Sequence, residues 1–470
     1  MSWIRSTPRI SGTYRTLTSL NPHGHSYPNN DIRDISSAVH FYQNKQLELY
    51  ASRSAQRLTL RQLVFFGRSM NEERLIKSAN YVRTELPVRI AHRLRDMQAL
   101  PYVVVTQEGV AKVYELYWSA FEKFRRYPPI NTLEENDAFC AFLGGLLDDH
   151  ATVIPNLSLG LSLSSPYLAP DRLDSFMRRM LVSRISRRVL AEHHIALSHF
   201  AKSTRDGEQS QKDHVGIIHT GLNVKECIDR CTMYLRNRRT DADGDLVEGV
   251  NEADWSEVIV DGHLDTRFAY IRQHLEYIIF ELLKNSLRAT RLKHPHARQL
   301  PPIGATIVAG ENHVMIRISD QGGGLSIPQI KSPSDLFSFS HVRNATRLED
   351  SRLGALRTAS SRREGVKATV DEQIDSWQHL LKDGNSSDAD ELARTGGGKA
   401  PLPRIGIGLP MSNIYATYFG GSLELVSMDG YGGLPVYDVS QLYSSAYPCA
   451  GTDVYLRLPR LGTNLEGIEL

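Results

Sequence analysis

The sequence predicts an α plus α/β fold, in which a four-helix-type bundle is followed by an α/β sandwich. Two observations lead to this prediction. Residues 35–210 repeat apolar residues with a helical period almost throughout. Residues 214–462 mix helical stretches with alternating stretches rich in β-branched residues, and glycine clusters follow them. The first half is therefore expected to be a helical bundle, and the second to place helices on one face of a mixed sheet.

Length and composition limit the class of protein. The chain has 470 residues, with 41% hydrophobic and 23% charged residues, which is typical of globular proteins with two or three domains. The net charge of +2 gives no global argument for binding nucleic acid or an anionic membrane. No apolar run approaches the ~20 residues needed to span a bilayer, so membrane insertion is not expected.

Residues 1–34 are expected to be a mitochondrial presequence and a disordered lead. The first twenty residues contain Arg5, Arg9 and Arg15 and many Ser and Thr, and the first acid of the chain is Asp31. Arg-rich, Ser-rich and acid-poor composition is typical of such presequences. A disordered basic tail is the alternative. The pattern therefore favours a mitochondrial location.

In the helical half, four segments carry the helical period most clearly, and Pro and Gly cluster between them. They are LTLRQLVFFGRSM, SANYVRTELPVRIAHRLRDM, VAKVYELYWSAFEKFRR and FMRRMLVSRISRRVLAEHHIAL. His193, His194 and His150 attract attention as possible ligands or catalytic groups. Because no partner spacing completes a metal site, we expect them in the core or on a helix surface.

The second half contains an unusual helix, HLEYIIFELLKNSLRAT, at residues 274–290. One face is apolar, through Leu275, Ile278, Ile279, Leu282 and Ser286. Another face aligns a carboxylate, an amide and a cation, at Glu281, Asn285 and Arg288. A core helix does not need such a polar row, which indicates a functional site.

The remaining elements follow in order. ATIVAG and HVMIRISD alternate as strands, with GEN as the hairpin turn, and DQGGGLS comes next. Residues 341–402 are polar and poor in aromatics, which predicts a long mobile loop. LPMSNIYATYFGG reads as a helix closed by a glycine pair. SLELVSM and DVYLRLPRL are predicted strands, with an insertion at residues 431–449 between them.

Three separate pieces together suggest a nucleotide site. The amide oxygen of Asn285 suits a hard cation such as Mg²⁺. The carboxylate of Asp320 ends a strand and is followed by glycines, which let a backbone approach a flat ligand closely. Gly406 and Gly408 precede a helix N-terminus, where amide groups and the helix dipole favour phosphate. One glycine motif alone is weak evidence, but the three pieces occur in order on suitable elements.

These pieces resemble a known superfamily. ELLKNSLRAT resembles the N-box, DQGGG the G1 box and GIGLP the G2 box of the GHKL (Bergerat-fold) ATPases and kinases, which include histidine kinases, gyrase, Hsp90 and MutL. Over residues 35–460 the chain is similar to the mitochondrial α-ketoacid dehydrogenase kinases. Further similar segments are RISDQGGG, GTDVYLRL, ELPVRIAHRL, VYELYWSAF, LLDDH, LVSRISRRVLAEHHIAL and VGIIHT.

The resemblance implies a role for each site residue, with ATP and Mg²⁺ as ligands. Glu281 corresponds to the general base that acts on the substrate serine, Asn285 to the Mg²⁺ ligand, and Asp320 to the carboxylate that contacts the adenine amino group. Other positions correspond to nucleotide contacts, namely Gly322, Gly324, Gly406, Gly408 and Leu409, with Ser340 as the best candidate for a hydroxyl in a loosely matching loop.

The resemblance also implies a function and partners. Members phosphorylate serine on the E1α subunit of a dehydrogenase complex in the mitochondrial matrix and thereby inactivate it. A lipoyl-bearing E2 core and a second copy of the chain are the other implied partners. Tyr277 stands where the pyruvate dehydrogenase kinases carry a histidine, and the chain ends in EGIEL without their aromatic-acidic tail. The branched-chain complex is therefore the favoured substrate, with pyruvate dehydrogenase as the alternative.

One departure keeps other readings open. Arg404 replaces the first glycine of the family's G-x-G-x-G-L-P pattern, so a catalytically weak scaffold remains an alternative. A protein-histidine kinase would need a phosphoacceptor such as His193 or His194, which follow an acid on a helix. An ATP-driven clamp would need further transducer domains.

Overall fold

The computed structural model describes residues 45–68, 70–164, 167–205, 213–237, 239–240, 246–247, 255–324, 333–339, 407–428, 451–460 and 464–468. The expected presequence (1–34), mobile loop (341–402) and insertion (431–449) lie outside these residues, as do Ser340, Arg404 and Gly406. Within the described part of the chain, no helix is both long and apolar enough to cross a bilayer.

The helical region extends from residue 45 to residue 205. Its helices are α2 (Lys45–Ala51), α3 (Leu60–Arg68), α4 (Glu72–Gln98), α5 (Tyr102–Val105), α6 (Glu108–Arg126), α7 (Leu133–Asp149), α8 (Val153–Leu163) and α9 (Pro170–Arg205). All four periodic segments are confirmed as helices, in α3, α4, α6 and α9. Helices α7 and α8 have no counterpart among those segments. A capping box between Thr132 and Glu135 marks the start of α7.

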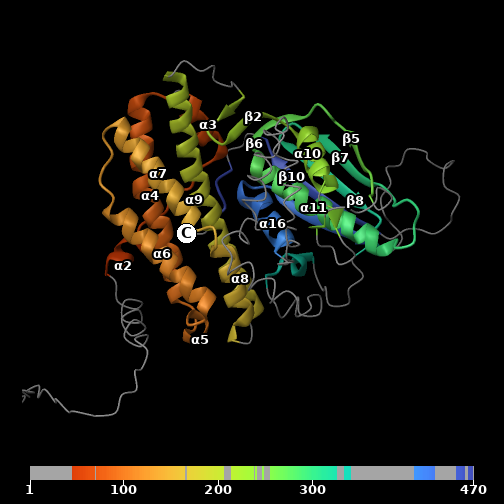
Figure 1. Ribbon diagram of the computed structural model, residues 1–470, viewed down its shortest axis with the longest axis horizontal. Helices are drawn as coiled ribbons and strands as arrows, with labels where there is room; N and C mark the ends of the chain where they lie inside the picture. The colour runs from red at the N-terminus through yellow and green to blue at the C-terminus, as the bar shows by residue number, and fades with distance from the viewer. Residues whose placement is uncertain are drawn as a thin grey trace, which may run out of the picture. The chain divides into compact units, whose positions relative to one another are not determined.

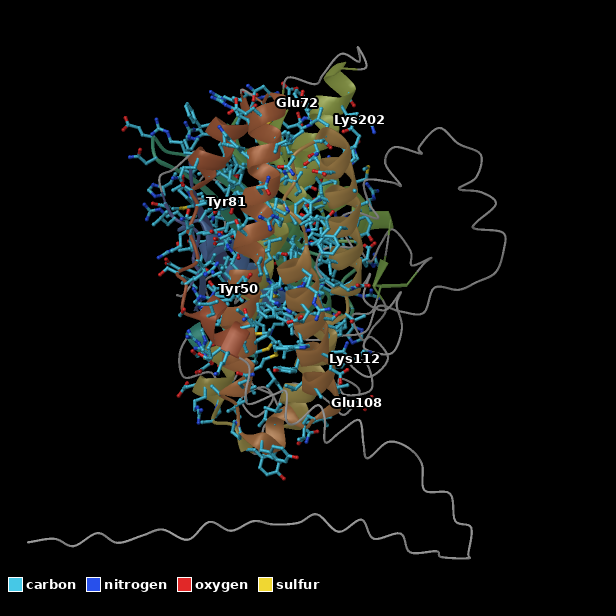
Figure 2. All side chains as sticks on the ribbon, turned by 90° about the vertical axis from the view of Figure 1, so that its left-hand side faces the viewer. Tyr50, Glu72, Tyr81, Glu108, Lys112 and Lys202 are labelled. Atoms are coloured by element: carbon cyan, nitrogen blue, oxygen red, sulfur yellow. The ribbon has the colours of Figure 1, made fainter. Side chains whose placement is uncertain are left out.

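The long helices pack side by side around an apolar interior. Helix α4 packs against α6, α7 and α9, and α6 packs against α8. Glu72, which begins α4, and Lys202, near the end of α9, lie at one end of the region, and Glu108, which begins α6, lies at the other (Figure 2). Large side chains fill the interior, among them Tyr117, Phe121, Phe139 and Phe176. Burial of such aromatic groups provides much of the stabilisation of this region.

The sheet region follows. Its elements are β1 (His214–Val215), β2 (Ile218–Asn223), α10 (Val224–Asn237), β3 (Arg239–Thr240), β4 (Leu246–Val247), β5 (Val258–Gly262), β6 (Arg267–Ile271), α11 (Arg272–Lys293), β7 (Ile303–Ala309), β8 (His313–Asp320), η3 (Pro333–Phe337), α16 (Gly408–Tyr418), β9 (Ser422–Met428) and β10 (Gly451–Pro459). Five strands form a sheet in the order β5-β7-β8-β10-β9. Because only β5 and β7 pair in parallel, the sheet is mixed, as expected.

One face of this sheet holds the core. The register places Ile307 opposite Ile316, Ile316 opposite Leu456, and Leu456 opposite Leu423, so one buried apolar row crosses four strands. Helices α10, α11 and α16 lie against one face of the sheet (Figure 1). The α plus α/β class is therefore confirmed, with a helical region followed by a mixed sheet and its helices.

A buried polar cluster links the two regions. The guanidinium group of Arg89 in α4 lies 3.0 Å from Oε1 of Glu85 and 2.8 Å from Oε1 of Glu466 near the C-terminus. The hydroxyl of Tyr418, the last residue of α16, donates to Oε2 of Glu466 at 2.5 Å. Burial alone would lower the pKa of Arg89, but the Glu466 carboxylate raises it above its ordinary value. The cluster therefore favours the charged form of Arg89.

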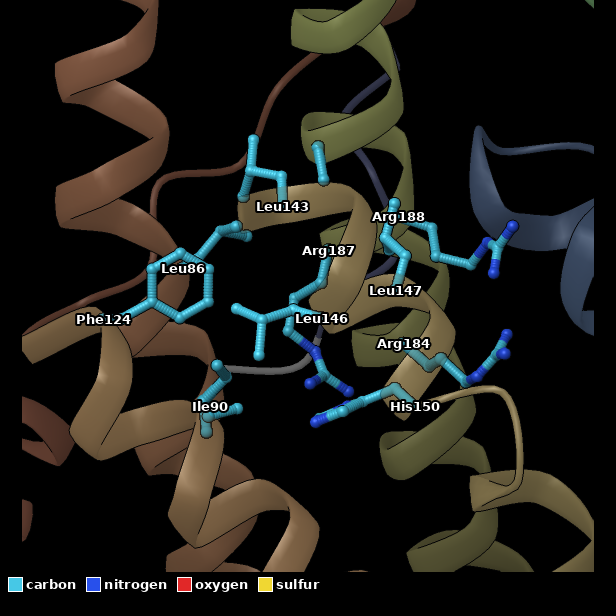
Figure 3. Close-up of a pocket in the computed structure, with 12 residues that line it drawn as sticks. Leu86, Ile90, Phe124, Leu143, Leu146, Leu147, His150, Arg184, Arg187 and Arg188 are labelled. Carbon is cyan, nitrogen blue, oxygen red and sulfur yellow. The ribbon is translucent and has the colours of Figure 1, made fainter. Parts of the chain in front are cut away.

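A cavity opens among α4, α6, α7 and α9 (Figure 3). Apolar side chains line most of it, and His150, Arg184, Arg187 and Arg188 contribute the polar part. Burial, followed by the charges of Arg187 and Arg184, lowers the pKa of His150 to about 3, so its ring is neutral at pH 7. None of the predicted nucleotide residues lines this cavity.

Candidate active site

Helix α11 carries two of the predicted site residues on one side. Its apolar face is buried as expected, because α11 packs between α10, β8 and α16. Glu281 is only 5% exposed, while Asn285, one turn later, is exposed. The helix therefore holds the carboxylate at the edge of the core and presents the amide to solvent.

The Glu281 carboxylate is held on two sides. Nζ of Lys284 lies 2.6 Å from its Oε1. On the other side lies Gly408, the first residue of α16, and a Cβ built there would lie 2.0 Å from Oε2. A side chain at position 408 would force the Glu281 carboxylate or α16 to move, so the carboxylate and position 408 constrain each other. The structure thus brings the predicted base directly to the predicted phosphate loop.

Asp320 ends β8 and is 4% exposed. Its Oδ1 accepts a hydrogen bond from the backbone N–H of Gly322 at 2.9 Å. Burial raises the pKa of Asp320, and hydrogen bonds from Gly322, Ser286 and the backbone of Thr452 partly oppose that rise. Asp320 therefore joins β8 to α11 and β10 and keeps a fixed orientation.

The glycines after Asp320 have a steric reason to be glycines. A Cβ on Gly322 would lie 2.4 Å from Cβ of Ala289 in α11. Gly324 has a φ of +72°, in the left-handed region that side chains disfavour. The backbone of this loop thus passes directly over α11, next to the residues that follow Asn285.

The start of α16 presents backbone N–H groups that no side chain of the described residues caps. Gly408 and Leu409 lie in its first turn and are half-buried. The first amide groups of a helix have no acceptor within it, and the helix dipole attracts negative charge there. This end of α16 therefore has the chemistry that a phosphate group requires.

Two further residues belong to the site and were not predicted as members. Lys284 contacts Glu281, and its position three residues later on the same helix is a signal that the sequence contains. Ser286 had been assigned only to the apolar face, yet it hydrogen-bonds Asp320. Its partner lies on another element, so no local pattern could have indicated this contact.

Comparisons with known proteins show which kinases the chain resembles. A family model described as mitochondrial branched-chain alpha-ketoacid dehydrogenase kinase matches residues 57–219. Mitochondrial [pyruvate dehydrogenase (acetyl-transferring)] kinase 2 of Saccharomyces cerevisiae is 29% identical over 95% of this chain and 90% of its own length. The corresponding kinase of Arabidopsis thaliana is 28% identical over 87% and 92%, and isozyme 4 of Mus musculus is 27% identical over 83% and 82%.

The chain is similar to the mitochondrial α-ketoacid dehydrogenase kinases, and the findings fit that family. The family resemblance of the sequence is thereby confirmed, and with it the class of enzyme, an ATP-dependent protein kinase.

The paired histidines are structural. His193 and His194 in α9 are both buried, and burial lowers the pKa of each to about 4. The ring of His194 lies 3.0 Å from Oγ of Ser78 and 3.0 Å from Oδ1 of Asn136. A phosphoacceptor must reach a nucleotide held by another part of the protein, and these rings lie in the helical core. The geometry therefore does not support a protein-histidine kinase.

The fit of a metal ion depends on the nucleotide. Among the described residues, no group of three or more His, Cys, Asp or Glu side chains could hold a metal ion. Mg²⁺ at kinase sites takes one or two protein ligands and completes its shell with phosphates and water. The exposed amide of Asn285 on the same helix as Glu281 fits that requirement.

Replacing Gly408 with alanine should displace Glu281. The new Cβ would overlap the carboxylate, so either α16 or the carboxylate must move. A misplacement of ~1 Å in a reacting group can cost about 100-fold in rate, and we expect a loss of that order in kcat for phosphoryl transfer. Gly145→Ala in α7 is the matched control, because its Cβ would meet nothing within 4 Å. Equal rates for the two variants would contradict the proposed contact.

Proposed function

We propose that this chain is a protein serine kinase of the mitochondrial matrix that phosphorylates and inactivates the E1α subunit of pyruvate dehydrogenase. The observation that carries the proposal is the Glu281 carboxylate beside the N-terminus of α16. Support for the substrate comes from the relatives, which are named pyruvate dehydrogenase kinases. The preference for the branched-chain complex drawn from Tyr277 is not supported by these relatives. That complex stays a second candidate because the matching family model carries its name.

The two regions of the fold are proposed to have different tasks. We assign residues 35–210 to a regulatory bundle of four-helix type and residues 214–462 to a GHKL kinase domain. In favour of the second assignment, Glu281 in α11 lies beside Gly408 in α16, and α11 packs against β8, which ends at Asp320, in a mixed sheet whose helices lie on a single face. The expected loop (341–402), with Ser340, and Gly406 would complete the nucleotide site.

Each residue of the site has a proposed task in binding ATP. The Asp320 carboxylate would accept a hydrogen bond from the adenine amino group, since it is buried and rigidly held. The backbone of Gly322 and Gly324 would lie along the base, and the amide groups at Gly408 and Leu409 would receive phosphate oxygens. Asn285 would hold Mg²⁺, which when bound neutralises phosphate charge and orients the γ-phosphoryl group.

Glu281 would act on the protein substrate. Its Oε1 is occupied by Lys284, which leaves Oε2, beside the first turn of α16, as the proton acceptor. As the serine Oγ forms its bond to the γ-phosphorus, the bond from phosphorus to the ADP oxygen breaks, and the serine proton passes to Oε2. Phosphoryl transfer depends mainly on positioning and charge stabilisation, so one well-placed carboxylate is sufficient.

The partners follow from the same assignment. We propose that the kinase docks on the lipoyl-bearing E2 core of the complex, acts on E1α there, and forms a homodimer. The names of the relatives support a mitochondrial dehydrogenase complex as the setting.

Parallel phosphorylation of the two purified E1 proteins tests the proposed function. The kinase is incubated with labelled ATP and either pyruvate or branched-chain E1, and the label is tested for stability in acid. We expect acid-stable phosphoserine, faster on the pyruvate E1α, with loss of dehydrogenase activity. Faster labelling of the branched-chain protein would restore the second candidate. Acid-labile label on the kinase itself would indicate a histidine kinase, and no transfer despite ATP binding would indicate a scaffold.

A further inference from the structure

The carboxylate of Asp174, in the helical region, accepts two hydrogen bonds from a segment of the sheet region. Asp174 lies in the first turns of α9. Its Oδ2 accepts a hydrogen bond from the hydroxyl of Ser338 at 2.6 Å, and its Oδ1 accepts one from the backbone N–H of Phe339 at 2.7 Å. Asp174 and Ser338 are 164 positions apart in sequence. Both oxygens of one carboxylate thus hold two consecutive donors.

Residues 333–339, which contain Ser338 and Phe339, lie against α16, the helix whose N-terminus is the predicted phosphate site. Residues 333–337 form the short helix η3, which packs against α16 (Figure 1, in teal). Ser338 is only 2% exposed, and Leu336 and Phe339 are buried as well. Helix α9 also packs against α16. Asp174 therefore connects α9 to the segment that supports the helix carrying Gly408 and Leu409.

This contact is costly to lose because one side chain accepts hydrogen bonds from two buried donors at once. If Asp174 lost its carboxylate, the hydroxyl of the buried Ser338 and the N–H of Phe339 would both lose this acceptor, which is costly for buried groups. The change that costs the least free energy would be a movement of residues 333–339 away from α9. Helix α16 would then lose part of its packing.

We infer that Asp174 is a positioning residue for the nucleotide site: it fixes residues 333–339 between α9 and α16 and thereby holds the start of α16 in its ATP-binding position. The inference rests on the proposed function of that site. Asp174 is not among the residues proposed to contact ATP or the serine substrate, and it acts through Ser338 and Phe339. The helical region thus takes part in forming the nucleotide site.

Three variants and one control test this inference in the full-length kinase. Asp174→Ala removes both hydrogen bonds. Asp174→Asn can keep both, since its amide oxygen accepts from Phe339 and its NH₂ group donates to the Ser338 hydroxyl. Ser338→Ala removes only one. Asp137→Asn is the control, because Asp137 forms an exposed ion pair with Lys202 at 3.4 Å on the helical surface.

The measured quantities are the dissociation constant for Mg-ATP by calorimetry and KM for ATP separately from kcat. We expect Asp174→Ala to weaken both ATP constants about tenfold, with a smaller change in kcat at saturating ATP. Asp174→Asn and Asp137→Asn should stay close to the unaltered chain, with Ser338→Ala between them and Asp174→Ala. Rescue by asparagine is decisive, because it separates the hydrogen bonds from the charge.

Two results would overturn the inference. One is unchanged ATP affinity in Asp174→Ala with the fold intact by circular dichroism. The other is an equal loss in Asp174→Asn and Asp174→Ala, which would assign the effect to charge. If Asp174→Ala fails to fold, Ser338→Ala decides, and ATP affinity equal to that of the control would reject the inference. Failure of the proposed function is distinguishable, because the unaltered chain would then not phosphorylate either E1.

Discussion

Glu281→Gln is expected to reduce phosphoryl transfer to E1 by about 10²–10⁴-fold, the usual cost of losing a general base. Glutamine has the same shape as glutamate, so the approach of Gly408 to position 281 is preserved. It cannot accept the serine proton, and it loses the charge that pairs with Lys284. ATP affinity should change little, because the carboxylate acts on the incoming hydroxyl. Initial rates with purified E1 and calorimetry with Mg-ATP provide the two measurements.

A second glutamate–lysine pair provides the control for this experiment. Glu73 lies 2.6 Å from Lys77 in α4, the same distance as in the pair of Glu281 with Lys284, but its side chain is 72% exposed. Glu73→Gln should leave both transfer and ATP affinity unchanged. Wild-type turnover in Glu281→Gln would remove Glu281 from the mechanism. Loss of ATP binding in that variant would mean that the carboxylate supports the nucleotide site rather than the chemistry.

Glu466→Gln is expected to lower the free energy of unfolding by about 3–5 kcal/mol, the range for breaking a buried ion pair on one side. The side chains of Arg89 and Glu466 are only 1% and 3% exposed. Water therefore cannot solvate the guanidinium charge of Arg89 after the Glu466 carboxylate is removed. Burial, followed by the charge of Glu466, raises the pKa of Tyr418, which keeps its hydroxyl as the donor to that carboxylate. Urea unfolding followed by fluorescence and circular dichroism measures the effect.

An exposed pair and a double variant sharpen the stability test. Asp149→Asn breaks the pair with Lys123, in which both side chains are 48% exposed, and should cost less than about 1 kcal/mol. Arg89→Met and Glu466→Gln combined should cost less than the sum of the single changes, because the two residues share one interaction. Additive losses would show that the two groups contribute independently. A loss in Glu466→Gln as small as in the Asp149 variant would contradict the importance of the buried cluster.

The elements of the sheet region could largely be read from the sequence because their signals are local. The helical period of Leu275, Ile278 and Leu282 predicted α11 and its buried face. The alternation in β7 and β8 and the turn between them predicted a hairpin, which forms with Gly310 N–H donating to the carbonyl of His313. The glycine pair after α16 ends that helix, with Gly420 at a φ of +81°. Each signal lies within about a dozen residues.

The sequence was less informative where a segment has no strong period of its own. Helix α8 is apolar almost all round, so periodicity alone does not distinguish it from a buried strand. The sequence was also a weak basis for the substrate preference, because the branched-chain complex was favoured from Tyr277 and from the last residues of the chain. Tyr277 packs its ring against Tyr415 in the core, 5.2 Å between centroids, which is a sufficient structural reason for an aromatic residue there.

The sequence alone determined the α plus α/β fold class and the family resemblance, and it predicted the three nucleotide boxes, because each depends on residue types at short, fixed spacings. Only the tertiary structure decided which residues meet across the chain. It brought Gly408 against the Glu281 carboxylate and joined Asp174 to Ser338 by a hydrogen bond. It also paired Arg89 with Glu466, which is 377 positions away in sequence. Many carboxylates and donors could pair at such separations, because closing a longer loop costs only slightly more entropy. The packing of helices on the sheet and on one another selects among them, and that selection has no local signature.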